Sequence, residues 1–289
     1  MSKNRTVERL LYAEKIDMGG FPVRQAFPTQ HVEQIDPFLL LHHAVLKVPE
    51  GAIPHKSGVD PHPHRGFSPV TFVYKGGVHH RDSRGNDSVV YAGGTQWMKA
   101  GMGVVHSERP PKDIHEHGGE QEIIQLWVNL PKANKMDQPA YYPLQAQDTP
   151  VFEAENGNVR AGVVAGNFEG ISGPIKTPSP VLALRIDMKA GATYTFPIPE
   201  SYNAFLYLLH GKISVEGFGL SDELHAVVFK RDGTSCTFTA LKDTQALLMA
   251  GKPLEEPLAS HGPFVMNTQS EIMQAMRDYQ MGKMGMLIE

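Results

Sequence analysis

The sequence predicts an all-β fold built from two series of short strands, each compatible with a sandwich or a small barrel. The first observation is composition: 28 Gly and 22 Pro among 289 residues fit short strands joined by tight turns better than long helices. The second is the regular alternation of β-branched or aromatic runs with Gly-rich turns. The third is length, about twice the usual size of one domain, which leaves room for two domains.

The first strand series lies in the N-terminal half and contains the clearest strands. Residues 69–74 (PVTFVY) are β-branched and aromatic and end at a Gly-Gly turn, and residues 121–130 form a similar run. Residues 37–45 are a continuous apolar run that fits a buried strand or a short buried turn of helix. Residues 109–119 are turn-rich and predict a loop.

The second series predicts a second domain. Residues 131–148 are rich in Pro, Lys and Gln, and we expect them to form a linker along the protein surface. We therefore divide the chain into domains of residues 1–135 and 136–289. Short strands recur between residues 159 and 249 with the rhythm of the first series, which suggests a duplicated domain, although no identity between the halves supports this directly.

The C-terminal tail differs from both series. Residues 270–280 contain good helix formers with apolar side chains at helical spacing. Thr268 or Asn267 is suited to cap this segment, and Gly282 is suited to end it. The tail is therefore predicted to form a short helix.

Composition and charge narrow the class of protein. A formal net charge of −4 gives no electrostatic basis for direct binding to nucleic acid or to an anionic membrane. The single Cys236 excludes an internal disulfide framework and fits a reducing compartment. The N-terminus lacks the apolar stretch of a secretory signal, and no apolar run is long enough to span a bilayer. We therefore expect a soluble, cytoplasmic protein.

Two pairs of polar residues predict a metal site in the first domain. His62 and His64 are two residues apart, and His106 and Glu108 have the same spacing. Residues two apart on a strand share a face, so each pair can point into a barrel. Three imidazoles and a carboxylate would bind one divalent metal and leave positions open for a substrate. The alternative is that His62 and His64 lie in a surface loop, because the neighbouring prolines cannot donate a backbone hydrogen bond and favour sheet edges.

The remaining reactive side chains are weaker candidates. At least one residue of His42-His43 is expected to be a buried, hydrogen-bonded histidine, because the pair lies in an apolar run. His79-His80 with Asp82 could contact the site, since a liganding histidine usually donates the N–H of its other ring nitrogen to an acceptor. Residues 115–117 (HEH) are expected to be solvated, and Cys236 to be a small buried residue. The second series has no His-x-His pair, so we expect a single metal site.

Several short runs spread over nearly the whole chain carry a family resemblance. They are HPHRGF at 62–67, QWM at 96–98, AGMG at 100–103, HSE at 106–108, QLWVNLP at 125–131, GPFVMNT at 262–268 and YQMGK at 279–283. In combination they resemble the pirin family of bicupin proteins. The resemblance implies an all-β fold of two cupin-type β-barrels, here with a short C-terminal helix, and a metal in the N-terminal barrel. It implies the ligands that strand parity also selects: His62, His64, His106 and Glu108.

The sequence departs from the family pattern at two places. Ser68 stands where family members often have Glu after Arg-Gly-Phe. His42-His43 replace the usual acidic residues that follow Asp-Pro-Phe-Leu. Neither departure removes a ligand, so we expect them to change the polarity or the mouth of the pocket.

The resemblance also implies a function. Pirin-like proteins are associated with an iron-dependent dioxygenase activity, similar to quercetin 2,3-dioxygenase, that cleaves flavonols such as quercetin with O₂. Glu108 would then be both a ligand and the catalytic base that takes a hydroxyl proton. Fe(II) is the expected metal, although Zn, Ni, Cu, Mn or Co also suit this ligand set.

Two other functions remain open from the sequence. One is a metal- or redox-responsive regulatory protein, a transcription cofactor or enzyme partner that binds another protein without turnover. The other is a Zn-dependent sugar isomerase, because cupin sites also host that chemistry.

Overall fold

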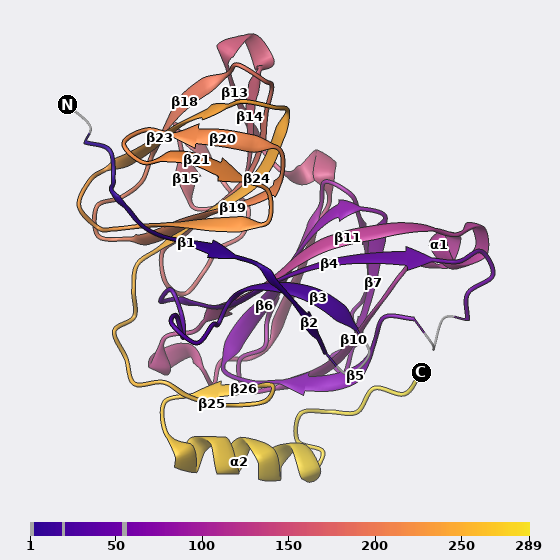
Figure 1. The fold of residues 1–289 in the computed structure, drawn as a ribbon. Coiled ribbons are helices and arrows are strands. Elements are labelled where there is room, and N and C mark those ends of the chain that lie inside the picture. The colour runs from indigo at the N-terminus through magenta and orange to yellow at the C-terminus, as the bar shows by residue number, and fades with distance from the viewer. Residues whose placement is uncertain (1–2, 19–20, 54–56) are drawn as a thin grey trace. The chain divides into compact units, whose positions relative to one another are not determined.

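The computed structural model describes residues 3–18, 21–53 and 57–289 and consists mostly of antiparallel β-sheet (Figure 1). The chain divides into two compact units. Unit 1 comprises residues 1–37 and 149–254, and unit 2 comprises residues 38–148 and 255–289. Each unit thus combines a middle segment with one end of the chain, which differs from a consecutive division at residue 135.

Unit 2 contains two larger groups of paired strands, the β25-β26 hairpin and both α-helices of the described chain. Its elements are β4 (Phe38–Val48), β5 (Val59–His64), β6 (Phe67–Lys75), β7 (Gly77–Asp82), β8 (Asp87–Tyr91), β9 (Thr95–Lys99), β10 (Val104–Arg109), α1 (Lys112–His117), β11 (Gly119–Asn129), β12 (Ala140–Leu144), β25 (Ala259–His261), β26 (Phe264–Met266) and α2 (Gln269–Gln280), with 3₁₀ turns at Lys132–Asn134 and Ala146–Asp148. One sheet contains β12-β9-β6-β11-β4 in that order, and the other is β5-β10-β7-β8. This arrangement of short antiparallel strands confirms the predicted all-β class.

In unit 2 the structure decides between two alternatives left open by the sequence and corrects two expectations. The segment at 37–45 forms strand β4 rather than a turn of helix. The expected loop at 109–119 contains the short helix α1. The expected linker at 131–148 contributes β12, which pairs with β9 through Tyr142 opposite Trp97. The linker is therefore part of a sheet of unit 2, where Tyr141 stacks on His80 and Tyr142 stays exposed.

The predicted C-terminal helix is present as α2. Thr268 caps it, and the Thr268 hydroxyl accepts from the backbone N–H of Glu271 while the Glu271 carboxylate accepts from the backbone N–H of Thr268. This reciprocal pair satisfies two backbone donors at the helix start. Figure 1 shows α2 in yellow alongside the β25–β26 hairpin, which it contacts through Ile272 and Ala275.

Unit 1 is a second antiparallel β structure. Its strands are β1 (Val7–Tyr12), β2 (Glu14–Asp17), β3 (Pro22–Phe27), β13 (Val151–Ala154), β14 (Val159–Ala165), β15 (Asn167–Phe168), β16 (Ile171–Ser172), β17 (Val181–Met188), β18 (Thr193–Pro197), β19 (Asn203–His210), β20 (Lys212–Val215), β21 (Gly219–Asp222), β22 (His225–Phe229), β23 (Ser235–Ala240) and β24 (Thr244–Gly251), with a 3₁₀ turn at Glu155–Gly157. The larger sheets are β1-β22-β19-β24-β17-β14-β13 and β18-β23-β20-β21, and β15 pairs with β16. The N-terminal strand β1 therefore completes a sheet made otherwise from the middle of the chain.

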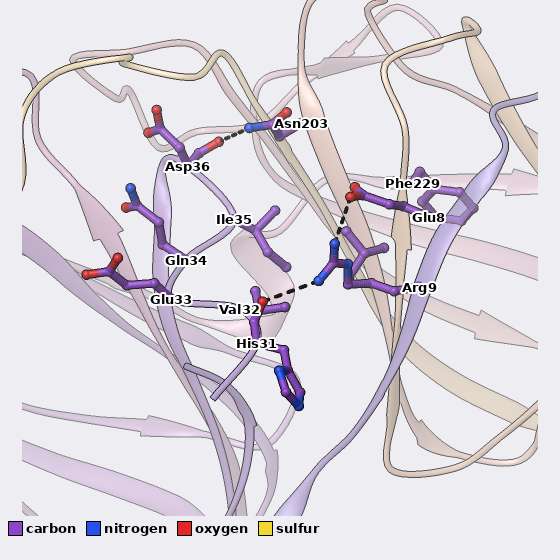
Figure 2. A pocket seen from close by; sticks show the side chains of 11 residues that line it. Glu8, Arg9, His31, Val32, Glu33, Gln34, Ile35, Asp36, Asn203 and Phe229 are labelled. Carbon is purple, nitrogen blue, oxygen red and sulfur yellow. Dashed lines mark hydrogen bonds and ion pairs between the residues drawn. The ribbon is translucent and has the colours of Figure 1, made fainter. Parts of the chain in front are cut away.

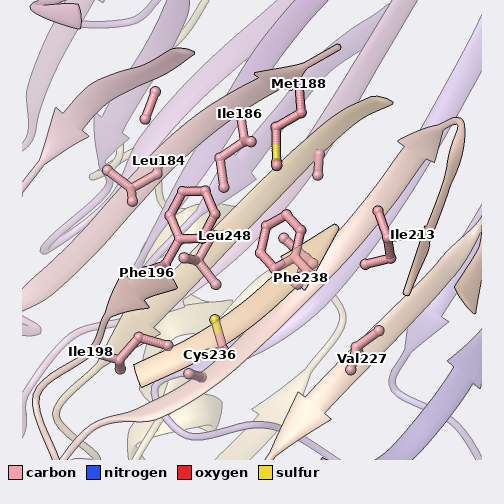
Figure 3. Close-up of a cluster of buried hydrophobic side chains, with 14 of the residues drawn as sticks. Leu184, Ile186, Met188, Phe196, Ile198, Ile213, Val227, Cys236, Phe238 and Leu248 are labelled. Atoms are coloured by element: carbon pink, nitrogen blue, oxygen red, sulfur yellow. The ribbon is translucent and has the colours of Figure 1, made fainter. Parts of the chain in front are cut away.

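Apolar side chains fill the interior of unit 1 (Figure 3). Phe196 and Phe238 stack with ring centroids 4.7 Å apart, and Leu184 and Leu248 belong to the same buried cluster. Cys236 is buried among them, and burial raises the pKa of its thiol to about 12, so it acts as a small apolar residue.

In the part of the chain that the structure describes, neither helix has the length and apolar content needed to cross a membrane.

Candidate metal centre

The predicted ligands lie on two neighbouring strands of unit 2. Strand β5 carries His62 and His64. Strand β10 pairs with it antiparallel and carries His106 and Glu108, with His106 directly opposite His62. Directly opposed side chains point to the same face of a sheet. The two strands therefore present the three imidazoles to one side.

The three imidazoles form a compact group. Their possible ligand nitrogens all lie within 4.8 Å of one another. The ring centroids are 4.7 Å apart for His62 and His64, 4.4 Å for His62 and His106, and 4.9 Å for His64 and His106. His64 and His106 are buried, whereas His62 is only partly buried. A single ion is within reach of all three rings.

The ring nitrogens are available to a cation. The Nδ1–H of His62 donates to the backbone oxygen of Asp60 at 2.8 Å, which leaves Nε2 with its lone pair. Both ring nitrogens of His64 and Nε2 of His106 are buried without a hydrogen bond of normal geometry among the described residues. A buried polar atom left unpaired costs about 1–3 kcal/mol. These nitrogens therefore fit a bound metal ion.

Burial keeps the two inner histidines neutral. Loss of solvent contact lowers the pKa of His64 well below its usual value, and the neighbouring His62 lowers it further, against an opposing effect of the Pro263 backbone. Burial likewise lowers the pKa of His106, assisted by the adjacent His62 and His64. Neutral imidazole is the form that binds metals.

Glu108 lies on the same strand but is held differently. Among the described residues, the group within 4.8 Å contains the three histidines and does not include Glu108. Its Oε1 accepts from the Thr71 hydroxyl at 2.9 Å and from Gln96, and its Oε2 accepts from Gln125 at 2.8 Å. All three partners are donors, so the side chain is bound as a carboxylate. The clamp holds Glu108 beside the imidazoles with part of its accepting capacity remaining.

A buried His–Asp pair lies behind His106. The Nδ1 atoms of His106 and His80 are 3.3 Å apart, and Nε2 of His80 is 3.0 Å from Asp82 Oδ2. With the His80 Nε2–H donating to Asp82, His80 Nδ1 accepts from His106 Nδ1–H and leaves His106 Nε2 for a metal. Burial tends to raise the pKa of Asp82, but hydrogen bonds from His80 and Asn86 lower it below its usual value.

Aromatic rings surround the site. Trp127 contacts His64 with ring centroids 5.5 Å apart and lies 4.2 Å from the ring of Phe67. Tyr141 of β12 stacks on His80 at 3.9 Å with an interplanar angle of 8°. His64 and His80 are therefore packed against aromatic rings, which restrict the orientation of these two imidazoles.

The other histidines mostly follow the sequence expectations. His42 and His43 are buried; burial lowers the pKa of His42 to about 4, and His43 Nε2 lies 3.0 Å from Glu122. His79 bonds to Asp87 at 2.7 Å, away from the site. The expectation that residues 115–117 are solvated is wrong for His115, which is buried on α1 because the helix turns it inward.

The sequence alone did not identify the residues that clamp Glu108 as functional residues. Gln96 and Gln125 appear in the runs that carry the family resemblance, but their role does not follow from spacing. The available signal is a polar side chain at an inward position of a buried strand: Thr71, Gln96 and Gln125 lie on β6, β9 and β11. Ser68, the first departure from the family pattern, is buried on β6.

A separate cavity of about 390 Å³ lies in unit 1 between residues 31–36 and strands β1 and β22 (Figure 2). Arg9 there bonds to Glu8 at 3.0 Å and to the backbone oxygen of His31 at 3.3 Å, and Asn203 donates to the Asp36 backbone. Among the described residues, none of its His, Asp or Glu side chains belongs to a group able to share one ion. The candidate site is therefore the one in unit 2.

The fold, with one such site among the residues that the structure describes, defines a two-domain cupin protein. Residues 20–128 match the family model described as Pirin, and residues 183–285 match the Pirin C-terminal cupin domain. A pirin-like protein from Solanum lycopersicum is 37% identical over 285 residues, covering 96% of this chain and 92% of its own length. The chain belongs to the pirin family.

Two solved structures are informative. A quercetin 2,3-dioxygenase from Acinetobacter baumannii has a TM-score of 0.93 and 33% identity, covering 99% of this chain and all of its own. A bacterial pirin from Escherichia coli, solved in complex with nickel(II), has a TM-score of 0.69 and 19% identity, covering 85% of this chain and 99% of its own. The second likeness shows the fold alone.

Proposed function

We propose that this protein is a metal-dependent dioxygenase that cleaves flavonols such as quercetin with O₂ at a single metal in unit 2. The observation that carries the proposal is the convergence of three neutral imidazoles, with unpaired ring nitrogens, beside a clamped carboxylate. The name of the similar structure from Acinetobacter baumannii supports the reaction class.

The proposed ligands are His62, His64, His106 and Glu108, with Fe(II) as the metal. Imidazole nitrogen and one carboxylate oxygen suit Fe, Zn, Ni, Cu, Mn and Co, so the metal present depends on geometry and supply. The hydrogen bonds to Asp60 and His80 support this set, because they aim Nε2 of His62 and His106 at the shared centre. When bound, the metal would hold the adjacent hydroxyl and carbonyl oxygens of the flavonol and mediate electron transfer to O₂.

Glu108 is proposed as the base that takes the flavonol hydroxyl proton. Thr71, Gln96 and Gln125 donate to its charged form and use three of the roughly four lone-pair positions of a carboxylate. The remaining position is the one that would serve the metal, so Glu108 accepts the proton when its carboxylate is detached from the metal, and the resulting flavonolate is electron-rich toward O₂. Because Glu108 is 6% exposed, water competes poorly for that position.

The surrounding residues orient a flat substrate. Trp127, which packs on the buried Phe67, offers an aromatic surface beside His64, and planar rings favour offset stacking on such surfaces. Unit 1, with an apolar interior, is assigned a structural role without a metal of its own. In this proposal the chemistry takes place in unit 2, and unit 1 contributes to stability.

The test is anaerobic loading with Fe(II), titration with quercetin, and then admission of O₂. We expect saturable binding, then loss of the flavonol absorbance with equimolar O₂ uptake. Metal-free protein and the His64→Ala variant are the controls, and they should consume neither quercetin nor O₂. Quercetin that stays intact in air on iron-loaded protein contradicts the proposal; capture of a protein partner only by the oxidised metal form, without turnover, would support a regulatory role instead.

A further inference from the structure

The strand that carries His62 has a bulge next to that residue. His106 lies opposite His62, but Glu108 lies opposite Val59, so β5 has one residue more than β10 in this interval. Asp60 and Pro61 occupy the bulge. Bulges near active sites re-aim side chains, and they need fixed surroundings to do so reproducibly.

Arg109 of β10 contacts the bulge and the segment that leads into it. Its Nη1 donates to the Ser57 backbone oxygen at 3.0 Å, and its Nη2 donates to Asp60 Oδ1 at 2.8 Å. Between these residues, Gly58 has φ +85°, and a Cβ there would lie 2.4 Å from the Glu108 backbone oxygen. The segment is therefore packed directly on β10, and the arginine fixes its two ends.

The bulge orients His62 through the backbone of Asp60. The Asp60 carbonyl accepts from His62 Nδ1–H at 2.8 Å, while the Asp60 side chain, 81% exposed, accepts from Arg109. One residue thus connects the arginine to the ligand. This matters most for His62, because it is the least buried of the three imidazoles and has the least packing to hold its ring.

Glu289 holds the arginine from the other side. Its Oε2 accepts from Arg109 Nε at 2.9 Å, and its Oε1 accepts from the hydroxyl of Ser107, the residue between His106 and Glu108. The Arg109 side chain is 11% exposed. A planar guanidinium with acceptors on several edges has one preferred orientation.

We propose that Arg109 is a positioning residue for the metal centre: with Glu289 behind it, Arg109 fixes the β5 bulge and so aims Nε2 of His62 at the metal. This rests on the metal site of the proposed function. Arg109 touches neither substrate nor metal in this role, and its effect reaches the site through the Asp60 backbone.

The test compares Fe(II) affinity, by anaerobic competition with a chromophoric chelator, in wild type and Arg109→Ala. We expect a loss of about 10- to 100-fold, the usual effect of removing a group that orients a ligand. Arg160→Ala, which removes an arginine–glutamate pair in unit 1, is the matched control and should leave affinity within twofold of wild type. Asp60→Ala should lower affinity, and Asp60→Asn, which keeps the accepting oxygen, should restore it.

A second readout separates positioning from general loosening. In metal-free wild type, ¹⁵N shifts should show His62 protonated at Nδ1 and bare at Nε2, with the signals assigned by their loss in His62→Asn. In Arg109→Ala the two His62 nitrogens should move toward each other, while the His106 signals stay unchanged. If Arg109→Ala does not fold, Glu289→Ala tests the same network and should shift the His62 signals alone.

The outcomes are distinguishable. Unchanged Fe(II) affinity and unchanged His62 shifts in folded Arg109→Ala overturn the positioning role while leaving the metal site intact. A wild-type protein that binds no Fe(II) overturns the proposed function itself. Equal changes at His62 and His106 show a merely structural arginine and also overturn the inference.

Discussion

The clamp around Glu108 makes a prediction that separates its two proposed roles. Gln125→Leu keeps the size of the side chain and removes the amide that donates to Glu108 Oε2 at 2.8 Å. Thr71 and Gln96 continue to hold Oε1. Because Glu108 is 6% exposed, water replaces the lost donor poorly. The carboxylate then loses its fixed orientation without losing its charge.

The expected magnitude follows from the charge of the acceptor. A hydrogen bond to a charged group contributes about 1.5–3 kcal/mol. Since about 1.4 kcal/mol corresponds to a factor of ten, kcat/KM for a flavonol should fall roughly 10- to 150-fold. The free energy of unfolding should fall by about 1–3 kcal/mol, the cost of leaving a buried oxygen unpaired.

The assay measures kcat/KM, bound metal and unfolding free energy on the same samples. Gln121→Leu is the matched control, because Gln121 lies on the same face of β11 and donates to the Gly77 backbone oxygen at 2.6 Å. It should lose similar stability and keep wild-type turnover. Wild-type turnover in Gln125→Leu, or equal losses in the two variants, would refute the base role. Loss of metal specifically in Gln125→Leu would show that the clamp chiefly serves Glu108 as a ligand.

Three further predictions concern stability. Hydrogen bonds from Lys283 and Arg65 lower the pKa of Asp278 to about 2. The stabilisation by Asp278 is therefore full above its unfolded pKa of about 3.9 and disappears as pH falls toward 2. In acid titrations followed by circular dichroism, the stabilities of wild type and Asp278→Asn should converge over that range. Burial lowers the pKa of Lys135 to about 8, and its Nζ donates to Gly66, Asn129 and Val265. Lys135→Met leaves these buried acceptors without their donor, so the free energy of unfolding measured in urea should fall by about 2–4 kcal/mol. Thr268→Ala should cost about 1 kcal/mol in the same assay and Thr268→Ser almost nothing, whereas equal effects would contradict the capping role.

The sequence predicted the features that depend on local spacing. His62 and His64 share a strand face because side chains alternate, and the structure brings both to His106. The helix at the C-terminus follows from helical spacing and the Thr268 cap. The apolar strands follow from β-branched runs bounded by glycines.

The features that depend on distant residues were not predictable from spacing. Thr71, Gln96 and Gln125 meet at Glu108 only because β6, β9 and β11 are neighbours in the folded sheet. The segment at 131–148 was predicted to be a linker because it is rich in Pro, Lys and Gln, yet pairing with β9 makes Ala140–Leu144 a strand. The grouping of residues 1–37 with 149–254, and of 38–148 with 255–289, likewise depends on tertiary packing and cannot be read from the order of segments along the chain.

The most direct test of the account is the metal stoichiometry of the purified protein and of its ligand variants, measured by elemental analysis after anaerobic loading with Fe(II). The account predicts one metal per chain in wild type and in His79→Ala, whose side chain bonds to Asp87 on the surface. It predicts loss of that metal in His64→Ala and in His106→Ala. Full metal content in both of the last two variants, or no metal in wild type, would contradict it.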